Sequence, residues 1–298
     1  MRGLLTMTCV DRTAQAGVTA FMQKLILSCA CGFFFAAPWM LSAQEMRVYT
    51  VTRAIESSSQ NVERQPVLAR SLTLFHAGKV YDYISSEQEV VIFEPAHHRF
   101  TILNESAAAV TVVSQDEIRR FLGLAEERAQ EVAADLLRSP DPQQRQSVEL
   151  LQFQLRPTFE TTYEPMTRRL QMQVPQFAYD AVCAEAPQPL VVDSYLRYAD
   201  AITELNSVLH PQSFLPAPRM ALNQQLRERG ILPISVRRRV EYGATLEIAA
   251  EHKWEWALTE LDRKYIDRWE SQISKGLLRP LSFEQMQRAV LTGKLSQR

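Results

Sequence analysis

Residues 71–104 read SLTLFHAGKVYDYISSEQEVVIFEPAHHRFTILN, and this stretch determines the class of fold. Short runs of Val, Ile, Leu, Phe, Tyr and Thr alternate here with polar links at 77–79, 85–88 and 96–98. Such residues are enriched in β-strands, and strands joined by short links pair as antiparallel neighbours. The stretch therefore predicts consecutive β-hairpins.

The same pattern extends on both sides of this stretch. Extended segments are predicted at 46–56, 67–76, 80–85, 89–95, 99–104, 109–114, 147–156, 158–164, 169–183, 231–243 and 245–258. The first six of these segments follow one another closely. Those within 147–183 follow a helical segment, and the last two lie later in the chain. We therefore expect one large antiparallel sheet.

The period of the apolar residues changes after Ser114. Glu117 follows Ser114 by three positions, which is a capping-box pattern at the start of a helix over 115–138. Further helices are predicted at 190–209, 219–230, 257–273 and 282–291. Strands and helices do not alternate regularly, which argues against a doubly wound parallel sheet. The sequence predicts an α+β fold: a curved antiparallel sheet, resembling a half-open barrel, with the 115–138 and 190–230 helices covering its concave face.

The N-terminal region has the order of a secretory signal peptide. Lys24 precedes an apolar run from Leu25 to Leu41, and small residues follow up to Ala43. We expect translation to start at Met22 and cleavage to follow Ala43, with a retained membrane anchor as the alternative. Residues 1–43 are then a leader, and 44–298 form a single domain with a helical insertion at about 190–230, located in the periplasm or secreted.

Composition and motifs limit the possible functions. The chain has 298 residues, 46% of them hydrophobic and 22% charged, which is typical of a globular protein. A formal net charge of −1 gives no broad field for nucleic acid. With 9 Gly and no G-x-S-x-G, P-loop, G-x-G-x-x-G or H-E-x-x-H pattern, the sequence favours no enzyme class and no cofactor.

The stretch TLEIAAEHKWEWAL, residues 245–258, alternates with a period of two. Such a strand has one dry face and one wet face. The dry face either fills the core, lines a ligand cavity or holds a reactive site. The residues that we expect to line the concave face of the sheet, and so to contact a ligand, are Tyr242, Leu246, Ile248, His252, Trp254 and Trp256.

Other reactive side chains have structural interpretations. His97 and His98, three and four residues after Glu94, are expected in a solvated turn and not at a metal ion, because no further Cys or His cluster supports them. Cys183 is expected to be a small buried hydrophobic residue. We therefore predict no metal site and no catalytic residue, and the alternative is a hydrolase centred on His252 or His76.

The run Arg237–Arg239 separates into two faces on a strand. Arg237 and Arg239 share the wet face, which is typical of a solvated or edge strand, although contact with acidic headgroups is the alternative. Arg238 falls on the apolar face between Val236 and Val240. A charge on such a face needs a partner or a ligand.

The run 71–104, with the following strand AVTVVS and helix QDEIRRFL, resembles secreted bacterial proteins with the lipoprotein-carrier fold. The resemblance covers residues 46–180 as strand order and turn placement. It implies a half-open barrel plugged by helices, with an apolar cavity for acyl chains. The helical segment 190–230 departs from the simple carrier pattern.

The expected function is therefore that of a secreted, non-enzymatic protein. It binds an apolar ligand, such as a lipid or an acyl chain, or an envelope partner protein, and it contacts the membrane only through the signal segment. Besides the hydrolase, the remaining alternative is a purely structural envelope component without a cavity.

Overall fold

The computed structural model describes residues 45–55, 65–138, 142–210 and 213–292. These residues belong to one compact unit of the chain, Leu41–Arg298. The predicted leader 1–43, with its expected start and cleavage site, lies outside them. Within these ranges, every helix is too short or too polar to span a bilayer.

Twelve strands form a single sheet, which is mostly antiparallel. The strands are β1 (Met46–Ala54), β2 (Val67–His76), β3 (Lys79–Ile84), β4 (Glu89–Glu94), β5 (Arg99–Asn104), β6 (Ala109–Ser114), β7 (Glu160–Glu164), β8 (Arg169–Val174), β9 (Phe177–Glu185), β10 (Ile231–Tyr242), β11 (Ala244–Glu255) and β12 (Arg279–Pro280). Their order is β12-β6-β5-β4-β3-β2-β1-β11-β10-β9-β8-β7. Within the described residues only β12 and β6 pair in parallel. The predicted α+β class and the hairpins from β1 to β6 are confirmed.

The hairpin between β2 and β3 shows why these links are so short. Ala77 and Gly78 both have positive φ angles, of 49° and 76°. This is the conformation of the two-residue loops whose twist matches that of paired strands, and glycine adopts it without steric cost.

The helices are α1 (Gln115–Leu136), α2 (Pro142–Leu155), α3 (Pro189–Leu209), α4 (Ala217–Arg229), α5 (Glu260–Ser274) and α6 (Phe283–Leu291). The Ser114 half of the predicted capping box of α1 is confirmed, because the backbone N–H of Glu117 donates to Oγ of Ser114. The extended segment predicted at 147–156 is wrong, since α2 occupies it. Pro142 at the first helical position and a run rich in Gln and Leu outweigh the local alternation there.

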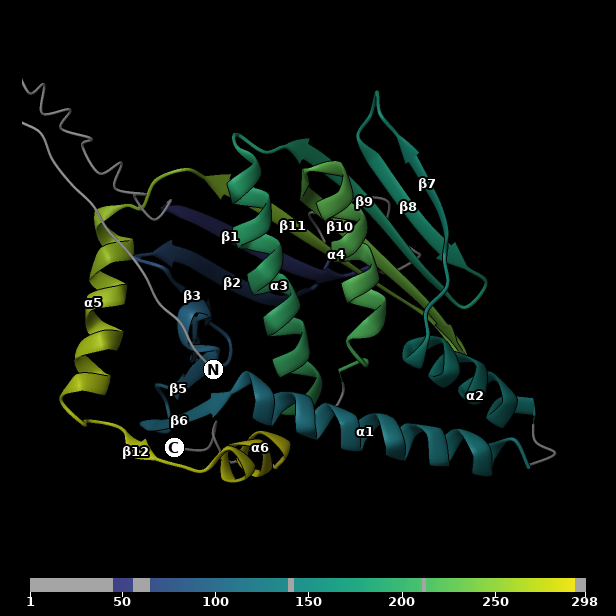
Figure 1. Ribbon diagram of the computed structural model, residues 1–298, viewed down its shortest axis with the longest axis horizontal. Coiled ribbons are helices and arrows are strands. Elements are labelled where there is room, and N and C mark those ends of the chain that lie inside the picture. The colour runs from purple at the N-terminus through teal and green to yellow at the C-terminus, as the bar shows by residue number, and fades with distance from the viewer. Residues whose placement is uncertain (1–44, 56–64, 139–141, 211–212, 293–298) are drawn as a thin grey trace, which may run out of the picture. The chain divides into compact units, whose positions relative to one another are not determined.

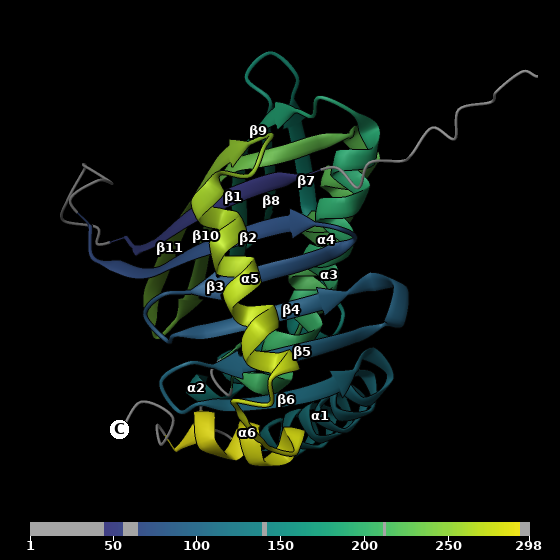
Figure 2. The same ribbon diagram turned by 90° about the vertical axis from the view of Figure 1, so that its left-hand side faces the viewer.

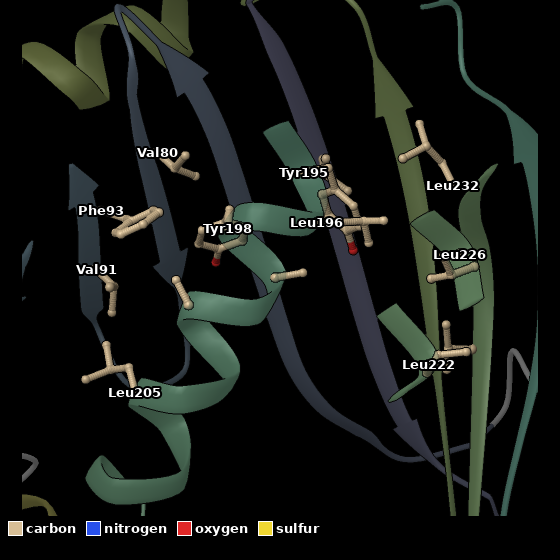
Figure 3. Close-up of a cluster of buried hydrophobic side chains, with 14 of the residues drawn as sticks. Val80, Val91, Phe93, Tyr195, Leu196, Tyr198, Leu205, Leu222, Leu226 and Leu232 are labelled. Carbon is tan, nitrogen blue, oxygen red and sulfur yellow. The ribbon is translucent and has the colours of Figure 1, made fainter. Parts of the chain in front are cut away.

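The helices α3 and α4 pack side by side against one face of the sheet (Figure 1). Their apolar side chains, such as Tyr198, Leu205 and Leu222, turn towards the strands (Figure 3). The ring of Tyr198 meets that of Phe75 on β2 edge-on, with 5.8 Å between centroids. This face carries the larger of the two hydrophobic clusters found in the described residues.

The helix α5 covers the opposite face of the sheet (Figure 2). Trp269 is fully buried there and stacks on Tyr81, with 6.2 Å between ring centroids. The adjacent Val80 belongs to the α3 side, because successive strand residues point to opposite faces. The same two helical layers cover both faces of the neighbouring strand β4, which is therefore buried along its whole length.

Candidate ligand-binding cavity

A cavity of about 320 Å³ lies between the helices α3 and α4 and the strands β9 to β11. The strands contribute Tyr179, Val236, Arg238, Ile248, Ala250 and His252. The helix α3 contributes Thr203, Asn206 and Ser207. The segment before α4 contributes Ser213, Phe214 and Leu215, and the first turn of α4 contributes Pro218 and Arg219. Small-molecule sites occupy roughly 300–1,000 Å³, so this cavity is at the small end of that range.

Two of the six residues selected from the sequence, Ile248 and His252, line this cavity. The register explains the grouping. Ile248 on β11 pairs with Arg238 on β10, and Ala250 pairs with Val236. Every second residue of both strands therefore points into the same space.

Trp254 continues this row but does not line the cavity. Its ring packs edge-on against Tyr195 of α3, with 4.7 Å between centroids, and its Nε1–H donates to the carbonyl of Pro233 at 2.9 Å. Trp254 is partly buried against the larger hydrophobic cluster. Its contacts fasten α3 to the sheet.

Tyr242, Leu246 and Trp256 lie outside the cavity lining and are 55%, 52% and 46% exposed. Tyr242 and Leu246 flank the turn of the long β10–β11 hairpin, and the hydroxyl of Tyr242 lies 3.0 Å from Oγ of Ser147. Trp256 follows the last residue of β11 and stacks on Trp254. Alternation along the strand continues beyond the part of the sheet that α3 and α4 bury.

His252 has one satisfied and one unsatisfied ring nitrogen. Its Nδ1 lies 2.9 Å from Oγ1 of Thr50, which is opposite it on β1. Its Nε2 is buried and has no hydrogen-bond partner among the described residues. Burial, followed by the charge of Arg219, lowers the pKa of His252 to about 3. The imidazole is therefore neutral at neutral pH.

Arg238 projects into the cavity, while its neighbours point to the other face. Arg237 pairs with Glu247 at 3.4 Å and Arg239 pairs with Glu241 at 3.3 Å, whereas Arg238 has no ion pair in the described part of the chain. The expected division of this run between two faces is confirmed. Of the two interpretations of the wet face, a solvated surface is confirmed, because Arg237 and Arg239 are exposed, whereas an edge strand is wrong, because β10 lies between β9 and β11.

The guanidinium of Arg238 stacks over Phe214, at 4.8 Å from the ring centroid, and its buried Nε has no hydrogen-bond partner in the described ranges. Burial lowers the pKa of Arg238 and Arg219 adds to this shift, while Tyr179 acts in the opposite direction. Arg219, in the first turn of α4, also forms no ion pair with any described residue.

Two buried tyrosines lie close to these arginines. Burial raises the pKa of Tyr179, and Arg219 and Arg238 oppose that shift. Burial likewise raises the pKa of Tyr195, and Arg219 opposes it through its charge and a hydrogen bond. Both phenols therefore keep their protons at neutral pH.

The two histidines of the hydrolase alternative have different surroundings. His76 has a carboxylate, because its Nδ1 lies 2.9 Å from Oε1 of Glu45, which also accepts from Arg263 at 2.8 Å. His252 has the hydroxyl of Thr50. Neither histidine contacts both a carboxylate and a nucleophile among the described residues.

The remaining reactive side chains are dispersed. Nδ1 of His97 lies 3.1 Å from Glu94, and Nδ1 of His98 lies 3.1 Å from Gln115. In the described ranges no three His, Cys, Asp or Glu residues gather at a metal-binding geometry. Cys183 is buried as predicted, and burial raises the pKa of its thiol to about 12.

Sequence reasoning identified the β10 and β11 side of the cavity but not the helical side. Arg219 and Phe214 follow the predicted helix 190–209 and carry no local pattern that distinguishes them from surface residues. Their position depends on how α4 packs against β10. No protein-family model and no curated protein matches the chain.

Proposed function

We propose that the protein binds a small apolar ligand, such as a single acyl chain, in this cavity. The observation that supports the proposal is the cavity itself, which interrupts an otherwise buried face of the sheet beneath α3 and α4. Apolar side chains of Phe214, Leu215, Val236 and Ile248 supply part of its wall. Ligand sites in proteins are clefts or cavities lined mainly by apolar side chains with a few polar groups, and this half-open cavity has such a lining.

The proposal includes the finer architecture expected from the sequence. In it the sheet is curved and half-open, and α1, α3 and α4 cover its concave face, as the resemblance to lipoprotein carriers implies. The volume of about 320 Å³ favours one short chain over a ligand with several long chains. The function proposed is therefore carriage or sensing of a single-chain molecule.

The proposed location is the periplasm or the extracellular space. The order of charged, apolar and small residues over 24–43 supports it. The described part of the chain contains one cysteine, which is buried and free, so its fold does not depend on a disulfide.

Native mass spectrometry of the protein, purified from a host that expresses the full chain, tests both the proposed ligand and the proposed location. We expect a polypeptide mass that begins after Ala43, and an additional small mass that dissociates on activation. Uptake of a fluorescent medium-chain fatty acid gives the affinity. An apo mass with no uptake of the fatty acid would contradict the proposal.

A pair of variants locates the ligand. Ala250→Phe places a ring in the cavity and is expected to weaken uptake at least about tenfold, because the ring occupies space that the chain would fill. Ala244→Phe, on an exposed position of the same strand, is the matched control and keeps the wild-type affinity. Equal affinities for the two variants would place the ligand elsewhere.

A further inference from the structure

Two cations share the candidate cavity without a compensating anion. Arg219 and Arg238 both line it, and none of its lining residues, all within the described ranges, is Asp or Glu. Other arginines of the same region are neutralised: Arg227, two turns along α4 from Arg219, donates to Asp200 at 2.6 Å. Burying an unpaired charge is unfavourable unless a partner or a ligand compensates for it.

The start of α4 adds positive potential at the same place. Its first turn contains no acidic residue, and no side chain caps its N-terminus. Leu215 and Pro218, on either side of that terminus, line the cavity together with Arg219. The positive end of the helix dipole and both guanidinium groups therefore act on the same space.

Two buried donor atoms complete the lining. Nε2 of His252 is buried and has no partner among the described residues, while Thr50 occupies Nδ1. When the hydroxyl of Thr50 donates to Nδ1, Nε2 carries the proton and is free to donate. Nε of Arg238 is also buried and unpartnered in the described ranges. Charge-assisted hydrogen bonds from such groups to an anion are the stronger kind.

We propose that the cavity recognises an anionic group, a carboxylate or a phosphate, attached to a short apolar chain, and that Arg219 and Arg238 bind the anion. The inference rests on the proposed function, which supplies the apolar part of the ligand. Phe214 holds the guanidinium of Arg238 in place, and Val236 and Ile248 offer the surface for the chain.

The test compares four probes by isothermal titration calorimetry of the mature protein at one fixed, low salt concentration. Decanoate and decyl phosphate carry the anion on a chain, decanol carries the chain alone, and inorganic phosphate carries the anion alone. We expect decanoate and decyl phosphate to bind at least about tenfold more tightly than decanol, because the hydrogen bonds to the charged group are made only by the first two.

Three variants assign the preference to the cavity. Arg238→Gln is expected to remove most of the preference for decanoate over decanol, whereas Arg238→Lys keeps part of it. Arg237→Gln is the matched control, because it removes the same charge from the adjacent residue on the opposite face, and it keeps the full preference. Arg219→Gln, on a separate element, repeats the test independently of β10.

The outcomes separate this inference from the proposed function. Equal affinity of the wild type for decanol and decanoate overturns the inference but leaves apolar binding intact. An equal loss of preference in Arg237→Gln and Arg238→Gln also overturns it. Tight binding of inorganic phosphate, comparable to that of decyl phosphate, supports the anion site, assigns it to a free anion and counts against the apolar chain. No binding of any probe contradicts both.

Discussion

Replacing His252 with Gln should remove a measurable part of the acid sensitivity of folding. Burial and Arg219 lower the pKa of His252 to about 3 in the folded protein, from its ordinary value of 6.5. Between these values the unfolded chain binds a proton that the folded chain does not. The stability contributed by neutral His252 is therefore complete above about pH 6.5 and is lost progressively as the pH falls towards 3.

The magnitude follows from the width of that interval. Each pH unit below the unfolded pKa costs about 1.4 kcal/mol of unfolding free energy, so lowering the pH from 7.5 to 5 costs up to about 2 kcal/mol through this residue. The Gln side chain does not titrate and still bonds to Thr50. Between pH 7.5 and pH 5, the His252→Gln variant should therefore lose about 1–2 kcal/mol less unfolding free energy than the wild type.

Urea denaturation at pH 7.5 and pH 5, followed by tryptophan fluorescence and circular dichroism, measures the difference. Using the change within each protein cancels the contributions of all other titrating groups. His98→Asn is the control, since His98 is exposed and Asn tolerates its positive φ of 49°. A difference below about 0.5 kcal/mol between His252→Gln and the wild type would refute the assignment of His252 as a buried neutral imidazole.

Three further predictions concern stability. Trp269→Ala should destabilise the fold by about 3–5 kcal/mol in urea denaturation, because the indole is fully buried beneath α5, while the affinity for decanoate stays unchanged; a parallel loss of affinity would mean that the two faces of the sheet are coupled. Ser114→Ala removes the hydrogen bond to the N–H of Glu117 and should cost about 1 kcal/mol, and a neutral effect would show that the cap contributes nothing. Burial raises the pKa of Asp82 above its ordinary value of 3.8, so its ionisation opposes folding increasingly as the pH rises above 3.8. Asp82→Asn keeps an acceptor for Thr73 and Tyr198 and should be at least as stable as the wild type at pH 7. Its advantage over the wild type in unfolding free energy should be smaller at pH 4. Clear destabilisation at pH 7 would indicate that the charge is needed.

Much of the sheet was predictable because its signals are local. The predicted bounds 67–76, 99–104 and 109–114 coincide with those of β2, β5 and β6, where apolar alternation ends at polar turns. The error at 147–156 arose where short alternation and helix propensity compete in one segment, now part of α2. The continuous apolar run in β4 was itself a sign of burial on both faces, which α5 completes.

The candidate cavity was predictable only in part. Arg238 was conspicuous in the sequence, because a charge between Val236 and Val240 conflicts with an apolar face. Ile248 and His252 followed from the same period of two. Arg219 could not be identified, because only the packing of α4 against the sheet brings it to the cavity. The exposure of Leu246 likewise reflects where helical cover ends, which is not a local property.

The most direct test of the central claim, that a chain-bearing ligand occupies the cavity beneath α3 and α4, is a methyl-detected NMR titration with decanoate. The account predicts chemical-shift changes at the methyl groups of Leu215, Val236 and Ile248, which line the cavity. The methyl groups of Ile92 and Leu103, in the cluster beneath α5, should not shift. No shift at the first group, or equal shifts at both, would contradict the claim.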